Sequence, residues 1–342
     1  MTDKITISGS VPKFDAEELK QLQSVQHAEY HSSKEGYEPV FAQFPYDLIM
    51  KVIELTNEGY TLSNDYPIVQ AITSILPLCD EFVIAVGKSD DDTLNLIKNI
   101  GSSKIKIIET IWDEGLKEGG RVFASETDKA YAAISKDTDW AFYIQGDECV
   151  HEKYLNTIKR QMLETLNNPN VEGLLFKYLH FYGSYDYIAE SRRWYRREIR
   201  LLKYHPDVHS YKDAQGFRKN GQKIKVKLID AYIYHYGWVK PPAGLNKKVR
   251  NFNKYYQTEE WIEEKFPQQD NFDFGNADRL VHFNGTHPKV FKENVLSTNW
   301  TLPIDPTGVN KKLSPRRKIL QWLEDKTGRR LFEYRNYILV KK

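Results

Sequence analysis

Short apolar runs alternate with helical patterns through the first half of this chain. Residues 81–86 (EFVIAV), 104–109 (KIKIIE) and 140–145 (WAFYIQ) each have the length and apolar content of a buried strand. Between them, residues 68–76 and 93–100 place apolar side chains at helical spacing. This alternation is typical of a parallel sheet covered by helices, so the sequence predicts an α/β fold with a mostly parallel central sheet.

The second half of the chain has a different pattern. Its predicted strands are longer and more aromatic, at residues 173–182, 196–203 and 224–236. From about residue 311 the pattern is helical, which predicts extra C-terminal helices, and Trp322 and Leu323 are candidate packing residues there.

The N-terminal region is the hardest part to assign. The first strand is either residues 5–8, followed by an insertion, or residues 50–55. Residues 10–60 therefore contain an insertion or an irregular region. The domain organisation that we expect is a main domain over residues 1–305, followed by a basic helical extension over residues 306–342.

Composition excludes several classes of function. The formal net charge of +2 gives no field that would attract nucleic acid. The two cysteines, Cys79 and Cys149, are too few for a disulfide framework or a cysteine zinc site. The chain starts without the apolar run of a signal peptide, and no stretch reaches the ~18 apolar residues of a membrane span. We therefore expect a cytoplasmic protein.

The charge is unevenly distributed along the chain. From Lys311 to Lys342 there are eleven Lys and Arg residues and three acidic ones, which gives this tail a local charge of +8. A basic tail is compatible with peripheral contact on the inner, anionic face of a membrane. The alternative is a terminal helix that is simply solvated.

Two adjacent acids follow a predicted strand in Gln145-Gly146-Asp147-Glu148. The carboxyl edge of a parallel sheet is where open α/β proteins bind their ligands. Carboxylates there suit Mg²⁺ or Mn²⁺, which prefer oxygen ligands shared with substrate phosphates. The alternative is a helix start, because acids are favoured in a first helical turn.

Three further segments contain candidate binding residues. The segment Ile233 to Trp238 closes a long predicted strand, and its His235 is either a metal ligand beside the acidic pair or a hydrogen-bonded core residue. Ser89-Asp90-Asp91-Asp92-Thr93 lies between a strand and a helix, where it either binds an anion or only caps the helix. Arg192, Arg193 and Trp194 combine arginines with an aromatic ring, which suits phosphate contacts, although surface arginines are common.

Taken in order, these segments resemble the family 2 glycosyltransferases, which have the GT-A fold. The strand EFVIAV followed by GKSDDDT resembles a family motif, with Ser89 and Asp91 matching and Gly87 in place of the usual acid. GGRVFASETDKAYAAI, which contains Arg121, resembles the glycine-rich helix of the family. Gln145-Gly146-Asp147-Glu148 resembles the D-x-D motif, with Gln145 replacing the first acid.

The resemblance continues toward the C-terminus. Lys212-Asp213 resembles the E-D pair, followed by Phe217-Arg218 as a short helix with an Arg, and by a strand that ends at His235. It covers about four-fifths of the chain, up to EYRNYILV. It implies an enzyme that moves a sugar from a nucleotide-diphosphate donor to the hydroxyl of a glycan or lipid-linked acceptor, with inversion, in surface polysaccharide or glycolipid assembly.

The resemblance also assigns roles to individual residues. It implies Asp213 as the catalytic base and a divalent cation, Mn²⁺ or Mg²⁺, held by Asp147, Glu148 and His235. The expected donor-binding residues are Ser89, Asp91, Arg121, Asp147 and Arg218, and the expected acceptor or phosphate residues are Arg192, Arg193, Trp194 and Trp238.

Two other classes of function stay open. A sugar nucleotidyltransferase can use the same sheet and an acidic metal site, although the N-terminal region contains no G-x-G-x-x-x-R loop for a triphosphate. A sugar- or partner-binding module without catalysis is the other alternative, because a fold does not determine a function.

Overall fold

The computed structural model describes residues 50–57, 66–88, 92–116, 118–269, 272, 274, 279–298, 300 and 314–340. The chain divides into two units, Met1–Leu48 and Ile49–Lys342, and every described residue lies in the second. The competing choice of residues 5–8 as first strand therefore lies outside the described part, whereas Met50–Asn57 forms strand β1.

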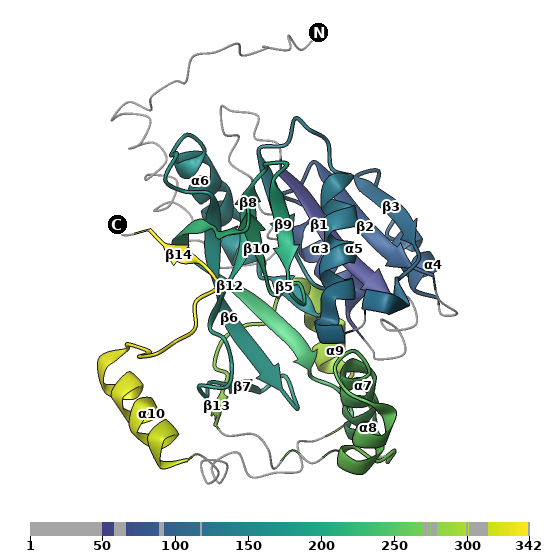
Figure 1. Ribbon diagram of the computed structural model, residues 1–342, viewed down its shortest axis with the longest axis vertical. Helices are drawn as coiled ribbons and strands as arrows, with labels where there is room; N and C mark the ends of the chain where they lie inside the picture. The colour runs from purple at the N-terminus through teal and green to yellow at the C-terminus, as the bar shows by residue number, and fades with distance from the viewer. Residues whose placement is uncertain are drawn as a thin grey trace. The chain divides into compact units, whose positions relative to one another are not determined.

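The described part is α/β, as the sequence predicts (Figure 1). Its first half contains β1, α3 (Ile68–Ile75), β2 (Glu81–Gly87), α4 (Thr93–Asn99), β3 (Ile105–Thr110), α5 (Arg121–Ala132), β4 (Trp140–Tyr143), β5 (Glu148–Val150) and α6 (Leu155–Thr165). Its second half contains β6 (Gly173–Tyr182), β7 (Tyr187–Ala189), β8 (Arg197–Lys203), β9 (Val208–Tyr211), β10 (Gly216–Lys219), β11 (Gln222–Lys223), β12 (Lys225–Trp238), α7 (Pro242–Asn253), α8 (Glu259–Lys265), β13 (Leu280–His282), α9 (Lys292–Leu296), α10 (Pro315–Thr327) and β14 (Ile338–Leu339).

The main sheet has a parallel half and a mixed half. Strands β3, β2, β1 and β4 are all parallel neighbours, which confirms the prediction for the first half of the chain. Beyond β4 the sheet continues through β8, which is antiparallel to both β4 and β6. The long strand β12 runs parallel to β6 and antiparallel to the short strand β5.

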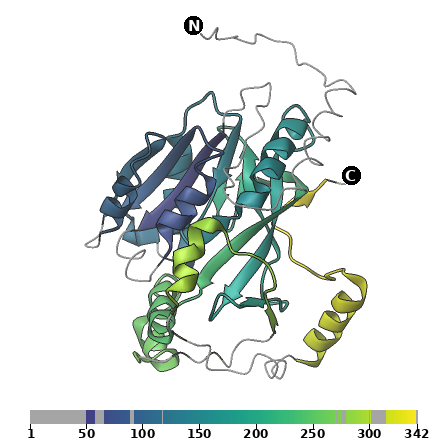
Figure 2. The same cartoon turned by 180° about the vertical axis from the view of Figure 1, so that it is seen from behind.

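Both faces of the parallel half are covered. Helix α5 packs on one face, where Ala130 and Tyr131 join Val83 and Ala85 in a buried cluster. The alternate residue Ile84 is also fully buried, because the opposite face is covered as well; Figure 2 shows α3 on that side. A strand that is buried on both faces has a continuous apolar sequence, which explains EFVIAV.

A small antiparallel sheet lies beside the main one. It contains β9, β10 and β11, and Phe217 on β10 packs edge-on against Tyr143 of β4 at 5.4 Å between ring centroids. The sequence prediction of a short helix around Phe217 and Arg218 was wrong, because these residues pair with Ser210 and His209 as a strand.

The C-terminal end of the chain returns to the main sheet. Helix α10 confirms the predicted helix, but β14 then pairs in parallel with β12, and Tyr337 is buried in the core. The tail is therefore not purely helical, and the predicted boundary at residues 305–306 falls outside the described residues. Within the described part, no helix is long and apolar enough to cross a membrane.

Candidate active site

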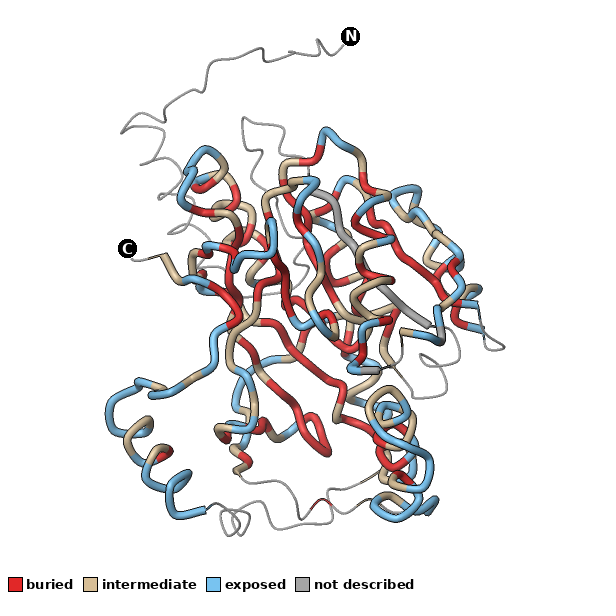
Figure 3. The backbone as a smooth tube through the Cα atoms, viewed as in Figure 1, coloured by how far each residue is buried: buried red, intermediate tan, exposed pale blue. Residues whose placement is uncertain are grey.

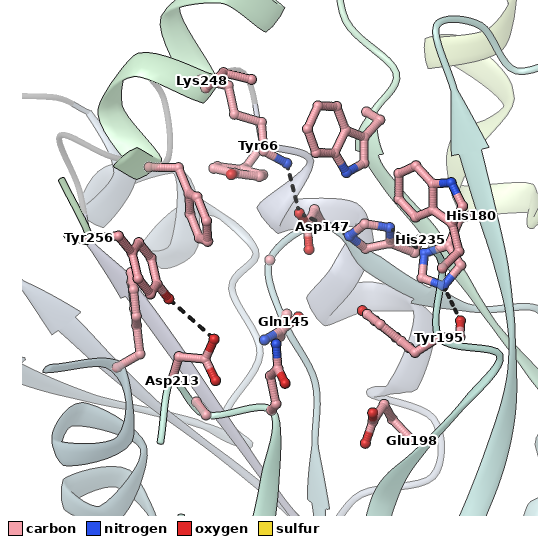
Figure 4. Close-up of a pocket in the computed structure, with 18 of the residues that line it drawn as sticks. Tyr66, Gln145, Asp147, His180, Tyr195, Glu198, Asp213, His235, Lys248 and Tyr256 are labelled. Carbon is pink, nitrogen blue, oxygen red and sulfur yellow. Dashed lines mark hydrogen bonds and ion pairs between the residues drawn. The ribbon is translucent and has the colours of Figure 1, made fainter. Parts of the chain in front are cut away.

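A cavity of about 540 Å³ opens beyond the carboxyl end of β4. Its walls are largely aromatic and its polar groups gather in a few places (Figure 4). The lining residues are Tyr66, Trp112, Phe123, Tyr143, Gln145, Gly146, Asp147, His180, Trp194, Tyr195, Glu198, Arg200, Asp213, Ala214, Gln215, His235, Trp238, Lys248, Val249, Phe252, Asn253, Tyr256 and Phe266.

Asp147 stands in the turn between β4 and β5. The N–H of Glu148 donates to the carbonyl oxygen of Gln145 over 2.9 Å, which closes the turn. The carbonyl oxygen of Asp147 accepts from the N–H of Tyr236 on β12 over 2.8 Å. The turn is thus fixed at both ends, and the Asp147 side chain faces the cavity.

Glu148 has a different environment from its neighbour. Its carboxylate is fully buried and accepts two hydrogen bonds from Arg200, from Nε to Oε2 over 2.8 Å and from Nη2 to Oε1 over 2.6 Å. The hydroxyl of Tyr178 donates to Oε1 over 2.7 Å, and the N–H of Gln145 donates to Oε2 over 3.2 Å. The expectation that both adjacent carboxylates bind a metal ion is therefore corrected, because Arg200, Tyr178 and the backbone already occupy the oxygens of Glu148.

His235 is oriented by a second histidine. Nε2 of His180 lies 2.6 Å from the carbonyl oxygen of Tyr195, which can only accept, so this nitrogen carries the proton. Burial lowers the pKa of His180 well below its ordinary value, so its Nδ1 is left as an acceptor for the Nδ1–H of His235 at 3.1 Å. The Nε2 of His235 is thereby turned toward Asp147, 3.5 Å from Oδ2.

Lys248 completes this cluster from helix α7. Its ammonium donates to the carbonyl oxygen of Gly237 over 2.6 Å and lies 3.5 Å from Oδ2 of Asp147. A Cβ atom at position 237 would lie 2.2 Å from Oδ2 of Asp147 and 2.6 Å from Nζ of Lys248. The side chains of Asp147, His235 and Lys248 therefore lie close together only because residue 237 has no side chain.

The charges around Asp147 keep it ionised. Burial by itself raises the pKa of Asp147, but electrostatic interactions with His235, Lys248 and Lys240 outweigh burial and hold the pKa below its ordinary value. Burial lowers the pKa of Lys248, and Asp147 offsets part of that effect. The cluster is therefore an ionised carboxylate beside His235 and the cationic side chain of Lys248 at the surface of a cavity.

Asp213 lies at a second polar place in the same cavity. It occupies the turn between β9 and β10, and its Oδ2 accepts from the hydroxyl of Tyr256 over 3.2 Å. Its neighbours Lys212 and Ala214 have φ values of 59° and 61°, a region that non-glycine residues rarely adopt. Such strained turns are concentrated at functional sites. Figure 4 shows the Asp213 group separate from the Asp147 group, with both facing the cavity.

Gly120 allows Asp213 and Tyr256 to lie close to the backbone at the start of α5. Its φ is 68°, and a Cβ there would lie 2.5 Å from the hydroxyl oxygen of Tyr256 and 2.9 Å from Cβ of Asp213. A glycine is required by both its conformation and this contact. The sequence pattern Gly119-Gly120 before α5 thus serves to bring Asp213 against the start of the helix.

Glu198 is a cavity residue that sequence reasoning missed. It lines the cavity from β8, and its Oε2 is buried with no hydrogen-bond partner among the described residues. Burial raises the pKa of Glu198 to about 8, the charge of Arg200 opposes the shift, and that of Glu148 adds to it. Near neutral pH this carboxyl group is mostly protonated and can donate a hydrogen bond to a ligand.

Two of the predicted arginines have structural partners instead of facing the cavity. The guanidinium of Arg218 donates to the carbonyl and side-chain oxygens of Asn336, at 3.2 and 2.5 Å, and stacks on Tyr211. Arg192 donates to Glu324 of α10 over 2.7 Å and to the carbonyl oxygen of Leu331. Both arginines therefore hold the C-terminal segment to the body of the protein.

The other predicted residues have mixed outcomes. Trp194 and Trp238 line the cavity, with ring centroids 5.8 Å apart at an interplanar angle of 90°. Arg193 and Arg121 are exposed and do not line it. The last two residues of the predicted set, Ser89 and Asp91, lie outside the described residues.

The donor set partly fits a divalent cation. Oδ2 of Asp147 and Nε2 of His235 are 3.5 Å apart, close to the roughly 3 Å between two ligands of one small cation. Among the described residues, no third Asp, Glu, His or Cys joins them to form a metal-binding group. Phosphate oxygens and water would have to complete the shell, as is usual for Mg²⁺.

No family model matches this chain, and no curated protein matches it. Three solved structures show what it is similar to. TarS residues 1–349 of S. aureus is 11% identical, over 64% of this chain and 69% of that one, with a TM-score of 0.32. Glucosyl-3-phosphoglycerate synthase from Mycobacterium tuberculosis, in complex with Mn²⁺, UDP and glucosyl-3-phosphoglycerate, is 16% identical, over 51% and 50% of the two chains, with a TM-score of 0.27.

The third structure, 4-diphosphocytidyl-2C-methyl-D-erythritol synthase, is 9% identical, over 46% of this chain and 76% of that one, with a TM-score of 0.31. The match to a longer TarS chain spans 39% of that chain. All four TM-scores lie below 0.5.

Proposed function

We propose that this protein transfers a sugar from a nucleotide-diphosphate donor to a hydroxyl acceptor. The proposal rests on one observation: a single aromatic cavity contains two separate polar groups that differ in charge. Asp147, His235 and Lys248 form a group suited to a diphosphate and its counter-ion, and Asp213 is a separate carboxylate suited to accept a proton. A displacement at a sugar needs both functions at once.

The diphosphate of the donor would lie against the Asp147 group. Lys248 is buried and its ammonium has donors left beyond the carbonyl oxygen of Gly237. The contact to Asp147 at 3.5 Å is long for a hydrogen bond, so a phosphate oxygen can replace it at little cost. Lys248 would then stabilise the negative charge that develops on the leaving group.

A divalent cation, Mn²⁺ or Mg²⁺, would be held by Asp147 and His235 together with the phosphates of the donor. Bound there, it would act as a Lewis acid on the diphosphate. His180 keeps Nε2 of His235 directed at this position through the Nδ1 contact. Glu148 is not part of the proposed ligand set, since Arg200 and Tyr178 occupy its oxygens.

Asp213 is the proposed base for the acceptor hydroxyl. Tyr256 donates to Oδ2 and leaves the other oxygen of Asp213 able to accept a proton. Attack from this side, with the diphosphate leaving on the other, is a single displacement that inverts the anomeric centre. Glu198 in its protonated form can donate to a hydroxyl of either sugar.

Aromatic side chains would bind the sugar rings. Trp194 and Trp238 stand at right angles in the cavity wall, and the C–H faces of a sugar pack well on such rings. The finer assignment of family 2, with a glycan or lipid-linked acceptor in polysaccharide or glycolipid assembly, is part of the proposal through the sequence motifs around Asp147 and Asp213.

Thermal unfolding with a panel of nucleoside diphosphates and nucleotide sugars, with and without Mn²⁺, tests the donor site. A ligand that binds only the folded state raises the Tm by mass action. We expect one nucleotide to raise the Tm more with Mn²⁺ than without it, and Asp147→Asn to remove this difference. If no member of the panel shifts the Tm of the folded protein, the proposed donor site is wrong.

A second measurement separates the classes of function. Release of the nucleoside diphosphate with sugar transfer or hydrolysis supports the transferase. Release of pyrophosphate from a nucleoside triphosphate would instead identify a nucleotidyltransferase, and ligand binding without either product would identify a binding module. Asp213→Asn is expected to stop transfer and leave the Tm shift in place, because Asp213 is not in the diphosphate group.

A further inference from the structure

Helix α10 is attached to the protein through its polar side. Glu324 accepts from Arg192 and from Arg330, each at 2.7 Å. Asp325 pairs with Arg279 at 2.8 Å, and Gln321, the buried residue of the helix, donates to Asp325 over 3.1 Å. The acidic side chains of α10, Glu324 and Asp325, are therefore the ones that hold it in place.

Two large apolar side chains of the same helix face outward, whereas Leu320 and Leu323 are half-buried. Ile319 is 61% exposed and Trp322 is 58% exposed, so the prediction of Trp322 as a packing residue was wrong. These residues and Lys326 are spaced three or four apart, so they share one side of the helix. Figure 3 shows most of α10 as exposed. An ordinary surface helix has the opposite arrangement, with its apolar stripe against the core.

Basic residues flank the apolar stripe. Arg316, Lys318 and Lys326 are exposed on α10. We name Arg316, Lys318, Ile319, Trp322 and Lys326 together the α10 surface. Its only neighbours of opposite charge within the helix are Glu324 and Asp325, which are paired as described above.

We propose that the α10 surface binds the surface of an anionic lipid bilayer. A helix with an apolar stripe that contains Trp and a basic polar face inserts at the level of the headgroups. Charge decides between a bilayer and a second copy of this chain. A symmetric contact between two α10 surfaces would place Arg316, Lys318 and Lys326 opposite like charges, which is unfavourable, whereas anionic headgroups attract all three.

Co-sedimentation of the full chain with vesicles tests the inference without any need for catalysis. We expect binding to vesicles of phosphatidylcholine mixed with phosphatidylglycerol and much weaker binding to phosphatidylcholine alone. Trp322→Ala should lower the partition coefficient about tenfold through lost apolar contact. Lys318→Glu and Lys326→Glu should each lower it at least fivefold, since one basic residue near such a surface contributes about 1 kcal/mol.

Leu296→Ala is the matched control, because Leu296 is 69% exposed on α9 and lies outside the α10 surface. It should bind vesicles as the unmodified chain does. All four substitutions are at exposed positions, so an unchanged Tm will show that the fold is intact.

Three outcomes would overturn the inference. The first is the absence of binding to anionic vesicles. The second is binding that the α10 substitutions do not weaken. The third is self-association in size-exclusion chromatography that Trp322→Ala abolishes, because this would make a second copy the occupant. None of these results depends on the donor site, so the proposed function stands or falls separately.

Discussion

Asp147 and Glu148 are adjacent in sequence, and each carboxylate faces a cationic side chain, yet their environments differ. Glu148 and Arg200 make two short contacts at 2.8 and 2.6 Å, with Tyr178 satisfying the same carboxylate. Asp147 meets His235 and Lys248 only at 3.5 Å, beside an open cavity. A saturated buried pair is costly to break by removing one partner, whereas loosely paired charges at a cavity are available to a ligand.

The largest expected effect is on stability, at Glu148. Glu148→Ala leaves Arg200 buried without its partner, which costs about 3–5 kcal/mol. Chemical denaturation measures this as a lower free energy of unfolding. Glu164→Ala is the control. Glu164 is exposed, and its contacts to Gln161 at 2.8 Å, Lys227 at 3.5 Å and Arg160 at 3.8 Å lie at the surface, so the change should be under about 1 kcal/mol. Equal effects of the two substitutions would remove the structural role assigned to Glu148.

The next effect is on activity, at Asp147. Asp147→Asn should lower the rate of sugar transfer roughly 100-fold or more, as losses of single charge-stabilising groups do. Its stability should change far less than that of Glu148→Ala. Steady-state kinetics with the donor found in the thermal panel measures the loss, and Asp137→Asn, at an exposed position on the surface, is the control. A variant that stays active would show that the cavity charge is not catalytic.

Lys248 tests whether the loosely paired charges around Asp147 are available to a ligand. Lys248→Met removes the charge and keeps the length of the side chain, so we expect about tenfold weaker binding of a nucleoside diphosphate, equal to about 1.4 kcal/mol. Titration calorimetry measures this with and without Mn²⁺. Lys247→Met is the matched control, since Lys247 is an exposed neighbour on the same helix. If Lys248→Met binds the nucleoside diphosphate as tightly as Lys247→Met does, Lys248 has only a structural role, through its contacts with Asp147 and Gly237.

The smallest effect concerns Glu198 and depends on pH. In the unfolded chain a glutamate ionises near 4.5, whereas burial raises the pKa of Glu198 to about 8 in the folded protein. The unfolded state therefore releases this proton first, so the contribution of Glu198 to stability is largest below about pH 4.5 and is lost as the pH rises toward 8. Glu198→Gln should reduce the fall in Tm over this interval by a few degrees. Identical pH profiles would contradict the raised pKa.

The parallel half of the fold was predictable because its signals are local. The apolar runs of β2, β3 and β4 and the helical spacing of α3 are visible within windows of ten residues. The small sheet of β9 to β11 was missed, because its residues are packed by distant parts of the chain such as Asn336.

The site was partly predictable for the same reason. The predicted residues that line the cavity are Asp147, Asp213, His235, Trp194 and Trp238, and each lies in or beside a motif that is recognisable in the sequence. The role of Glu148 was not predictable, because its partner Arg200 is 52 residues away. Lys248 had no local signal, since α7 meets Asp147 only after folding. Glu198 had a weak signal, because side chains two residues apart on a strand share a face and Glu198 shares one with Arg200.

The segment from Ser191 to Arg196 has two neighbours at once. Trp194 and Tyr195 form part of the cavity wall, while Arg192 and Arg196 hold Glu324 on α10, and the carbonyl oxygen of Trp194 accepts from Arg330. A movement of α10 that carried this segment with it would therefore move part of the cavity wall. If contact of α10 with another surface changes the affinity of the cavity for a ligand, then by linkage that ligand changes the affinity of α10 for the surface by the same factor.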